Sequence, residues 1–468
     1  MRIAVLPFDD LGAGKDREYL ADALTEETIS ALGQLDPDRV SVIGRTSVMT
    51  FRRTSKTLAQ IGRELDAAYL VESSIRAEAN RVRVTAKLIR AVDQVQVWSA
   101  VYDSEPASML AFQRELGTTI AEQIRLRLSP DRLAALTRRQ TRNPEAYDLY
   151  LRGRHFWNQL TPATTRQAID SFSRATAIAP DYALAWSGLA DAYASSPING
   201  DAPPLPAWAL ARKAAAQAVR AEAELAESQT SLGFVDFWFE WRWADAETAL
   251  RKAIVLDPSY ALAHRMLGIL LGALGRQAEA GQEMQRGRQL DPLSAMQHAL
   301  SAQVAFYARN YPAAVEFARQ AVVIDPRFWI AHFQLAQAYE QLGKDAQALQ
   351  AADDARGFSG GNSKTLSLRG YIFARQGRRD EARKVLQTLT ASAHDRFVPP
   401  YAMALVHAGL DERAAALDWL ERGFKVRDVH LISLPADPKW DGLRGEARFQ
   451  DLLRRCGFAG PRASLPPK

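Results

Sequence analysis

Three Asp-Pro pairs recur at a fixed interval in the second half of the chain. Their prolines are Pro258, Pro292 and Pro326, so neighbouring prolines lie 34 residues apart. Such an interval is typical of repeat architectures, in which each unit is too small to bury its own apolar face and must stack on its neighbours. The second half of the chain is therefore expected to form an elongated array of similar units.

The residues between these prolines keep the same phase. Small residues stand at the eighth and twentieth positions of each unit counted from Ala261, where two antiparallel helices must cross closely. They are Gly268, Ala280, Ala302, Ala314, Ala336 and Ala348. Period and phase resemble those of the tetratricopeptide repeat, and fainter copies extend the pattern to about eight repeats. We predict an all-α tetratricopeptide superhelix over 143–430, with a loop at 195–206 and a C-terminal capping segment over 431–460.

The first part of the chain, 1–132, alternates short β-rich runs with helical runs. This alternation predicts an α/β domain with a mixed sheet and flanking helices. The last three strands are separated by short polar turns, so they are expected to pair as an antiparallel meander. Strands are predicted at 3–8, 39–44, 67–78, 81–91 and 95–104, and helices at 16–35, 57–66 and 107–128.

The segments of this domain resemble a known bacterial module. IAVLPFDDLG (3–12), YLADALTEETISAL (19–32) and VWSAVYD (97–103) follow the order and spacing of the TolB-like amino-terminal domain. That family is found fused to tetratricopeptide repeats in CadC-like regulators and in sensor proteins associated with class III adenylate cyclases. The module usually lies downstream of an output domain, and no cyclase, kinase or winged-helix signature occurs in this sequence. The resemblance therefore implies the sensory or scaffolding part of a signalling system without its effector.

The candidate catalytic motifs lack residues or the structural context that catalysis requires. Asp9 and Asp10 follow the first predicted strand, where α/β enzymes place catalytic groups, but adjacent strand residues point to opposite sides. GAGKD (12–16) lacks the first Gly and the Ser or Thr of a phosphate-binding loop. GFSGG (357–361) lies between two repeats and not on a strand-to-helix elbow. We expect no enzymatic activity and no cofactor, with an unrecognised site in the α/β domain as an alternative.

Three histidines follow the repeat. His264, His298 and His332 occupy the fourth position of successive units, too far apart to share one metal ion. We expect them to pack between helices where the pattern usually has Trp, and a pH-responsive array is the alternative. Cys456 is the only cysteine, so no internal disulfide forms, and no metal site is expected.

Charge and hydropathy limit the classes of partner and the cell compartments that are expected. The 59 basic and 54 acidic residues are mixed along the chain, so no nucleic-acid partner is expected unless Arg138, Arg139 and Arg142 belong to a continuous basic strip. No apolar stretch is long enough for a membrane helix. The expected location is cytoplasmic as written, or periplasmic if an upstream membrane segment has been omitted. Oligomeric state stays open.

The remaining functional surface is the concave face of the superhelix. First helices of tetratricopeptide repeats line that face, and aromatic, Arg and Gln side chains there suit the binding of a peptide. We therefore expect a regulatory or scaffold protein that binds a protein or peptide partner; the alternative is part of a nucleotide cyclase or DNA-binding regulator. The predicted contact residues are Arg265, Gln303, Phe306, Tyr307, Phe333, Gln337, Tyr371 and Arg375.

Overall fold

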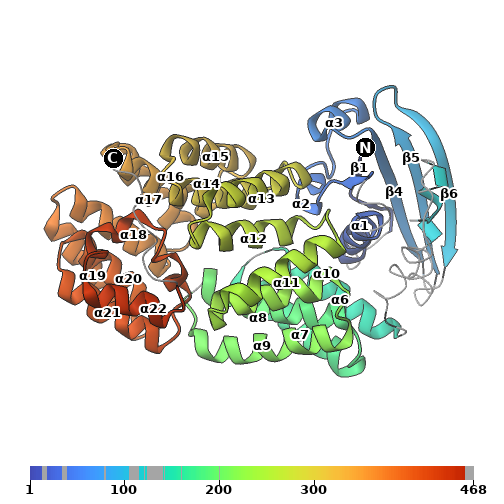
Figure 1. Ribbon diagram of the computed structural model, residues 1–468. Helices are drawn as coiled ribbons and strands as arrows, with labels where there is room; N and C mark the ends of the chain where they lie inside the picture. The colour runs from blue at the N-terminus through green and yellow to red at the C-terminus, as the bar shows by residue number, and fades with distance from the viewer. Residues whose placement is uncertain are drawn as a thin grey trace.

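In the computed structural model a mixed sheet with helices is followed by a long all-helical array, which confirms the predicted fold class (Figure 1). The structure describes residues 1–12, 18–33, 39–78, 81–104, 115–116, 118–120, 122–123, 141, 143–159, 161–199 and 201–458. The predicted helix 107–128 lies largely outside these residues, as do most of GAGKD and all of Arg138, Arg139 and Arg142.

The sheet has the strand order β3-β1-β4-β5-β6, and β2 also pairs with β4. Its strands are β1 (Arg2–Val5), β2 (Asp9–Asp10), β3 (Ser41–Val42), β4 (Tyr69–Glu78), β5 (Arg81–Arg90) and β6 (Val95–Ser104). β1 is parallel to β3 and β4, whereas β4, β5 and β6 are antiparallel, which confirms the predicted meander.

The predicted strand 3–8 is shorter in the structure. Pro7 has no N–H to donate to the ladder, and the N–H of Phe8 turns instead to the Oγ1 of Thr25, at 3.0 Å. The chain pairs with β4 again at β2, a short strand that lies beyond the predicted one. This bend brings the end of the strand onto α1 (Glu18–Gly33), the helix that contains Thr25.

Two further helices complete the described part of this domain, α2 (Arg45–Met49) and α3 (Leu58–Leu65). α3 begins at a capping box in which Thr57 and Gln60 satisfy each other's backbone N–H groups. The core on the α1 side of the sheet continues without a break into the first repeats, where Tyr147 and Phe172 belong to the same buried cluster as Val5.

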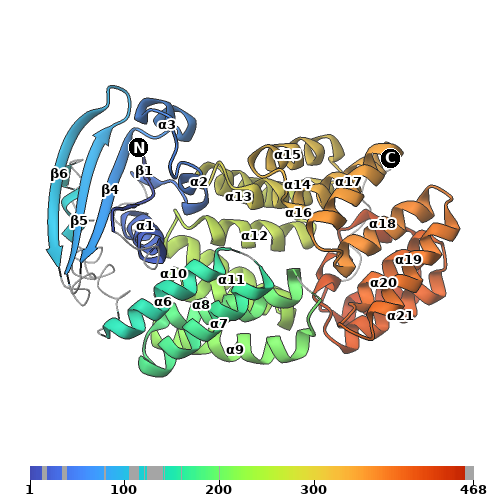
Figure 2. The ribbon, with the colours of Figure 1, turned by 180° about the vertical axis from the view of Figure 1, so that it is seen from behind.

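Sixteen α-helices of the described residues, α6 to α21, then follow one another as antiparallel pairs (Figures 1 and 2). They are α6 (Pro144–Trp157), α7 (Pro162–Ile178), α8 (Ala183–Asn199), α9 (Pro204–Ala221), α10 (Ala226–Val235, extended by the π-helix η3, Asp236–Glu240), α11 (Trp243–Leu256), α12 (Ala261–Ala273), α13 (Gln277–Leu290), α14 (Ala295–Tyr307), α15 (Tyr311–Ile324), α16 (Trp329–Gln341), α17 (Asp345–Phe358), α18 (Ser363–Arg375), α19 (Arg379–Ser392), α20 (Pro400–Gly409) and α21 (Arg413–Lys425).

Small residues allow the close helix crossings that the repeat demands. A Cβ atom on Gly268 would lie 2.9 Å from the sulfur of Met284, and one on Gly153 or Gly188 would lie 2.5 or 2.6 Å from the ring of Phe172. Separations this short are not tolerated in a packed core. The small-residue positions read from the sequence are therefore places where helices touch.

The predicted loop 195–206 is wrong in its extent. α8 continues to Asn199 with Pro197 inside its last turn, and α9 already begins at Pro204. Proline is tolerated in the first turn of a helix, where its missing N–H would have no intrahelical partner. The prolines that suggested a long loop thus lie within or at the start of helices.

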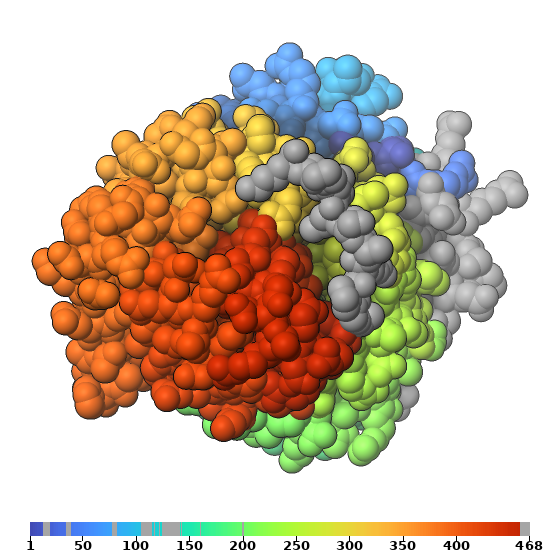
Figure 3. Space-filling model, turned by 60° about the vertical axis from the view of Figure 1, so that its left-hand side comes forward, coloured from blue at the N-terminus to red at the C-terminus, as the bar shows by residue number. Residues whose placement is uncertain are grey.

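After α21 the chain turns back across the array. Two 3₁₀ helices, η4 (Val429–Ser433) and η5 (Pro438–Leu443), precede α22 (Ala447–Arg455). The ring of Phe458 stacks on Trp243 of α11 at a centroid distance of 4.5 Å. In Figure 3 these red residues lie between the orange later repeats and the green earlier ones. The C-terminal segment therefore joins the last repeats to α11, the second helix of an earlier repeat.

No helix among the described residues is long and apolar enough to cross a membrane.

Candidate functional site: the concave face of the array

Helix α1 packs against α6, the first helix of the first repeat. The hydroxyl of Tyr19 donates to Asp148 of α6 at 2.5 Å, and the hydroxyl of Tyr150, also in α6, donates to Glu27 at 3.0 Å. The α/β domain is thus held against the first repeat of the array.

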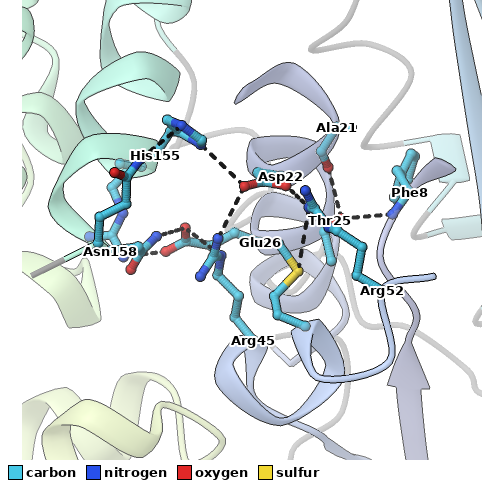
Figure 4. A network of polar contacts seen from close by, with 12 residues as sticks. Phe8, Ala21, Asp22, Thr25, Glu26, Arg45, Arg52, His155 and Asn158 are labelled. Atoms are coloured by element: carbon cyan, nitrogen blue, oxygen red, sulfur yellow. Dashed lines mark hydrogen bonds and ion pairs between the residues drawn. The ribbon is translucent and has the colours of Figure 1, made fainter. Parts of the chain in front are cut away.

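A cluster of charged side chains holds the α/β domain against α6 (Figure 4). Glu26 of α1 forms an ion pair with Arg154 of α6 and accepts a hydrogen bond at 3.0 Å from Asn158, the residue directly after α6. Arg45 of α2 lies 3.7 Å from the same carboxylate. Burial would raise the pKa of Glu26, but the positive charges of Arg154 and Arg45 outweigh it and hold the pKa below its usual value. The ionised form of Glu26 is therefore the one that stabilises the contact.

Asp22, one helical turn before Glu26, extends the cluster. Its carboxylate pairs with Arg45 at 3.5 Å and with Arg52, both of the same domain. It also lies 3.1 Å from Nδ1 of His155 in α6. Asp22 is almost fully buried, and a buried carboxylate needs such partners. The two acidic residues together tie the α/β domain to the first repeat.

A second contact joins the α/β domain to the turn between α13 and α14. The N–H and the hydroxyl of Ser47 both donate to Asp291, at 2.8 and 2.5 Å, and the N–H of Gly44 donates to the carbonyl oxygen of Leu290 at 2.6 Å. A Cβ atom at position 44 would lie 2.9 Å from the carboxyl carbon of Asp291. Glycine is therefore required for this close approach.

The C-terminal segment lies on the concave helices. The ammonium group of Lys439 donates to the side-chain oxygen of Gln337 in α16 at 2.9 Å and pairs with Asp437 at 2.8 Å. It also lies 4.6 Å from the ring centroid of Phe306 in α14. Only 2% of the Lys439 side chain is exposed. A fully buried ammonium group thus reaches the concave helices, where the aromatic face and two acceptors compensate its charge.

Trp440 anchors the same segment. Its side chain is fully buried, packs edge-on against Tyr401 of α20 at a centroid distance of 5.2 Å, and donates to the Tyr401 hydroxyl at 3.3 Å. The next residue, Asp441, forms an ion pair with Arg309 at 2.7 Å. An aromatic anchor flanked by paired charges is the arrangement of a tightly bound peptide.

The structure divides the predicted contact residues among three environments. Arg265 lines a cavity between α1 and α12; burial lowers its pKa, and its Nε has no hydrogen-bond partner. Gln303 is half-buried and donates to the hydroxyl of Tyr307 at 2.6 Å, and Arg375 is exposed, 3.5 Å from Glu340. The buried members are Phe306, Tyr307, Phe333, Gln337 and Tyr371.

Sequence reasoning missed the residues that complete this face. Tyr401 stands at the fifth position of the last repeat, four 34-residue intervals after Arg265, whereas Lys439 and Trp440 lie in the capping segment beyond the repeats. Lys364 of α18 lies 5.2 Å from the ring centroid of Phe333, and burial lowers its pKa to about 8. The repeat phase was a usable signal for Tyr401, and for Lys439 and Trp440 the signal was the Asp-Pro-Lys-Trp-Asp run at 437–441, which concentrates anchor-type residues in a short segment.

The repeated histidines have a structural role. Nε2 of His264, His298 and His332 lies 3.1, 2.8 and 2.9 Å from the carbonyl oxygen of the proline six residues earlier. Trp186 makes the same contact through its indole N–H, at 2.9 Å from the carbonyl oxygen of Pro180. The imidazoles therefore replace the usual Trp as donors to the preceding turn, as the packing interpretation expected.

The other singled-out motifs lie in turns. Asp10 accepts a hydrogen bond from the N–H of Gly12 at 2.9 Å, within the turn that follows β2. In the GFSGG run, Gly360 and Gly361 have φ angles of 69° and 73°, which glycine adopts without strain, and they connect α17 to α18. Within the parts of the chain that the structure describes, no three His, Cys, Asp or Glu side chains are placed to hold a metal ion.

Comparison with known proteins supports the repeat assignment. A model of the tetratricopeptide repeat family matches residues 236–295 and 300–363. A curated relative, a putative adenylate cyclase 3 from Rhizobium meliloti (strain 1021), is 31% identical over 187 residues, or 40% of this chain and 32% of that protein. The match thus spans about a third of the relative's length.

Solved structures that resemble the chain are repeat proteins of low sequence identity. A tetratricopeptide repeat protein from Parabacteroides merdae is 15% identical, with 56% of this chain and 99% of that chain covered and a TM-score of 0.40. The Cut9–Hcn1 hetero-tetramer of APC/C is 16% identical, with 75% and 62% covered and a TM-score of 0.43. The TolB-like assignment of the α/β domain stays a prediction. The C-terminal half of the chain consists of tetratricopeptide repeats, an architecture for protein–protein interaction.

Proposed function

We propose that this chain is the non-enzymatic interaction part of a bacterial signalling system, and that its array binds protein segments on the concave face. One observation carries the proposal: that face already holds a segment of the same chain. Residues 429–443 lie on the first helices of the last repeats, where Lys439 contacts Gln337 and Trp440 contacts Tyr401. These are the buried anchor and charge-assisted contacts by which peptides bind in grooves.

The signalling context is supported by the relative that is 31% identical and named a putative adenylate cyclase. The same likeness favours a second candidate function, namely that the chain is the regulatory region of a nucleotide cyclase or of a DNA-binding regulator. In both cases the α/β domain, TolB-like by its sequence, is held by the array.

An external partner is expected to contact the cleft beside the C-terminal segment. Gln303, Tyr307, Phe333 and Gln337 line this cleft together with Lys364. Its volume of about 40 Å³ admits side chains and not a whole segment. Partner binding would therefore begin at the accessible rim, which includes Gln303 and the exposed Arg375.

The test is a pull-down from a bacterial lysate with the intact chain as bait, read by mass spectrometry. The double variant Gln303→Ala/Arg375→Ala removes polar groups from the concave rim. The control Arg251→Ala/Gln320→Ala removes the same types of side chain from α11 and α15, the second helices of their repeats. We expect a captured protein to be retained by the control and lost by the rim variant while all three proteins melt alike. Capture that does not distinguish the two variants would contradict the proposal.

A further inference from the structure

A cavity of about 160 Å³ lies where the α/β domain meets the array. One wall comes from α1 and the start of α2, and the other comes from α6 and from α10 and α12, the first helices of later repeats. Pockets at domain interfaces are favoured positions for small ligands, because a ligand there contacts both parts at once. An engineered apolar cavity of about 150 Å³ binds one benzene molecule, so a cavity of this size admits a ligand of that order. Only a small molecule fits.

Arg265 supplies a positive charge without a partner in this cavity. Its Nε has no hydrogen-bond acceptor, and no described residue forms an ion pair with its guanidinium group. Asp291 acts on it only as a nearby charge, because that carboxylate accepts the two hydrogen bonds of Ser47. A desolvated guanidinium group without an acceptor is costly, and a carboxylate suits its donors geometrically.

Carboxylates outnumber guanidinium groups around the rest of the lining. Glu227 of α10, on the same wall as Arg265, accepts a hydrogen bond of 3.4 Å from Ser30 of α1, and Asp257 accepts the backbone N–H of Ser259. The whole lining contains five carboxylates and three guanidinium groups. They are Glu26, Glu27, Glu227, Asp257 and Asp291, with Arg45, Arg154 and Arg265. This excess of negative charge opposes a simple anion such as phosphate, whereas a simple cation would leave Arg265 unpaired.

We propose that the cavity binds a small zwitterion, an α-amino acid of the size of glycine, alanine or serine. Its carboxylate accepts hydrogen bonds from Arg265, and its ammonium group faces Glu227. This inference goes beyond the proposed function, since it concerns a small molecule at the domain interface and not a protein at the concave rim. Because the ligand contacts both walls, its binding stabilises the seating of the α/β domain on the array.

The test is isothermal titration calorimetry of the full chain with glycine, L-alanine and L-serine, accompanied by thermal unfolding at increasing concentrations of each. Acetate and methylammonium serve as probes that carry only one of the two charges. We expect one site per chain, a saturable rise in melting temperature, and binding of at least one amino acid about tenfold or more tighter than that of either probe.

Three variants test whether Arg265 and the cavity form the amino-acid site. Arg265→Gln removes the carboxylate-binding group and is expected to weaken binding at least tenfold. Ala261→Leu fills the cavity without changing its charge, so it serves where Arg265→Gln impairs folding. Arg212→Gln alters a guanidinium group on α9, 63% exposed and outside the cavity, and should bind as the unaltered chain does. The proposal is overturned if no amino acid binds at tens of millimolar, if acetate or methylammonium binds equally well, or if the folded cavity variants bind unchanged.

Discussion

The ammonium group of Lys439 lies 2.9 Å from the side-chain oxygen of Gln337, a residue 102 positions earlier in the chain. This contact holds the C-terminal segment on the concave face of the last repeats. Only 2% of the lysine side chain is exposed, so its charge is stabilised by protein groups and not by water. The superhelix is therefore not an empty groove. Its interior holds parts of its own chain, and the first prediction concerns that contact.

Removal of Lys439 should destabilise the fold strongly. Lys439→Ala leaves the buried carboxylate of Asp437 and the amide of Gln337 without their partner. Loss of one member of a buried ion pair costs about 3–5 kcal/mol. Urea denaturation followed by circular dichroism measures the free energy of unfolding. Lys425→Ala, at the exposed end of α21, is the matched control and should change that free energy by less than about 0.5 kcal/mol. Equal effects of the two substitutions would show that the segment is not seated as described.

The ion pair of Glu26 should make stability depend on pH at the acidic end. Its pKa in the folded chain is below the usual 4.5, because the charges of Arg154 and Arg45 outweigh burial. The stabilisation is therefore fully present above pH 4.5 and is lost as the pH falls through the folded value. Glu26→Gln should lower the free energy of unfolding near neutral pH by about 3 kcal/mol and flatten its acid dependence. A pH profile of the variant that runs parallel to that of the unaltered chain would contradict this role of Glu26.

Gly44 offers a test of the second contact between the domain and the array. Gly44→Ala places a methyl group 2.9 Å from the carboxyl carbon of Asp291, and overpacking of this kind costs about 1–3 kcal/mol. Gly281→Ala on α13 has nothing within 4 Å of its new methyl group and should stabilise the helix by about 1 kcal/mol. Opposite signs are expected from thermal unfolding of the two variants. A stabilising Gly44→Ala would exclude the close approach.

His298 should contribute a second pH dependence, near neutrality. Burial is the main cause that lowers its pKa below the usual 6.5, so the folded chain prefers the neutral ring, whose Nε2 lies 2.8 Å from the carbonyl oxygen of Pro292. This contribution to stability is fully present above pH 6.5 and is lost as the pH falls toward the folded value. His298→Gln should remove that part of the pH dependence between pH 5 and 7. Replacement of the exposed His394 by Gln should leave this part of the pH dependence of stability unchanged.

The fold was readable from the sequence where its pattern is local. The small residue at position 268 and the prolines at 258, 292 and 326 report contacts within one repeat or between neighbouring repeats, and the structure confirms them as helix crossings and helix ends. Sequence reasoning went wrong at 195–206, where it treated proline as a loop former although proline also starts helices.

The candidate site was readable only in part. Phe306, Phe333, Gln337 and Tyr371 lie on first helices, as their repeat positions predict, yet in the folded chain they are buried. Arg265 lies elsewhere, at the domain interface. Whether the set binds a partner stays a prediction. Nothing in the repeat phase indicates that the C-terminal segment covers the concave helices, because that depends on residues outside the repeat.

The sequence by itself determined the mixed sheet with its antiparallel meander and the stacked helix pairs that follow it. The meander and the helix pairs come from contacts between neighbouring segments, and the periods of two, of about 3.6 and of 34 residues are visible in one dimension. Only the tertiary structure decided that α1 packs against α6 and that 429–443 lies on the concave helices. Pairs such as Ser47 with Asp291, 244 residues apart, and Lys439 with Gln337 meet because small rotations between successive repeats add up to a curve. That curvature accumulates over the whole array, and no local pattern records it.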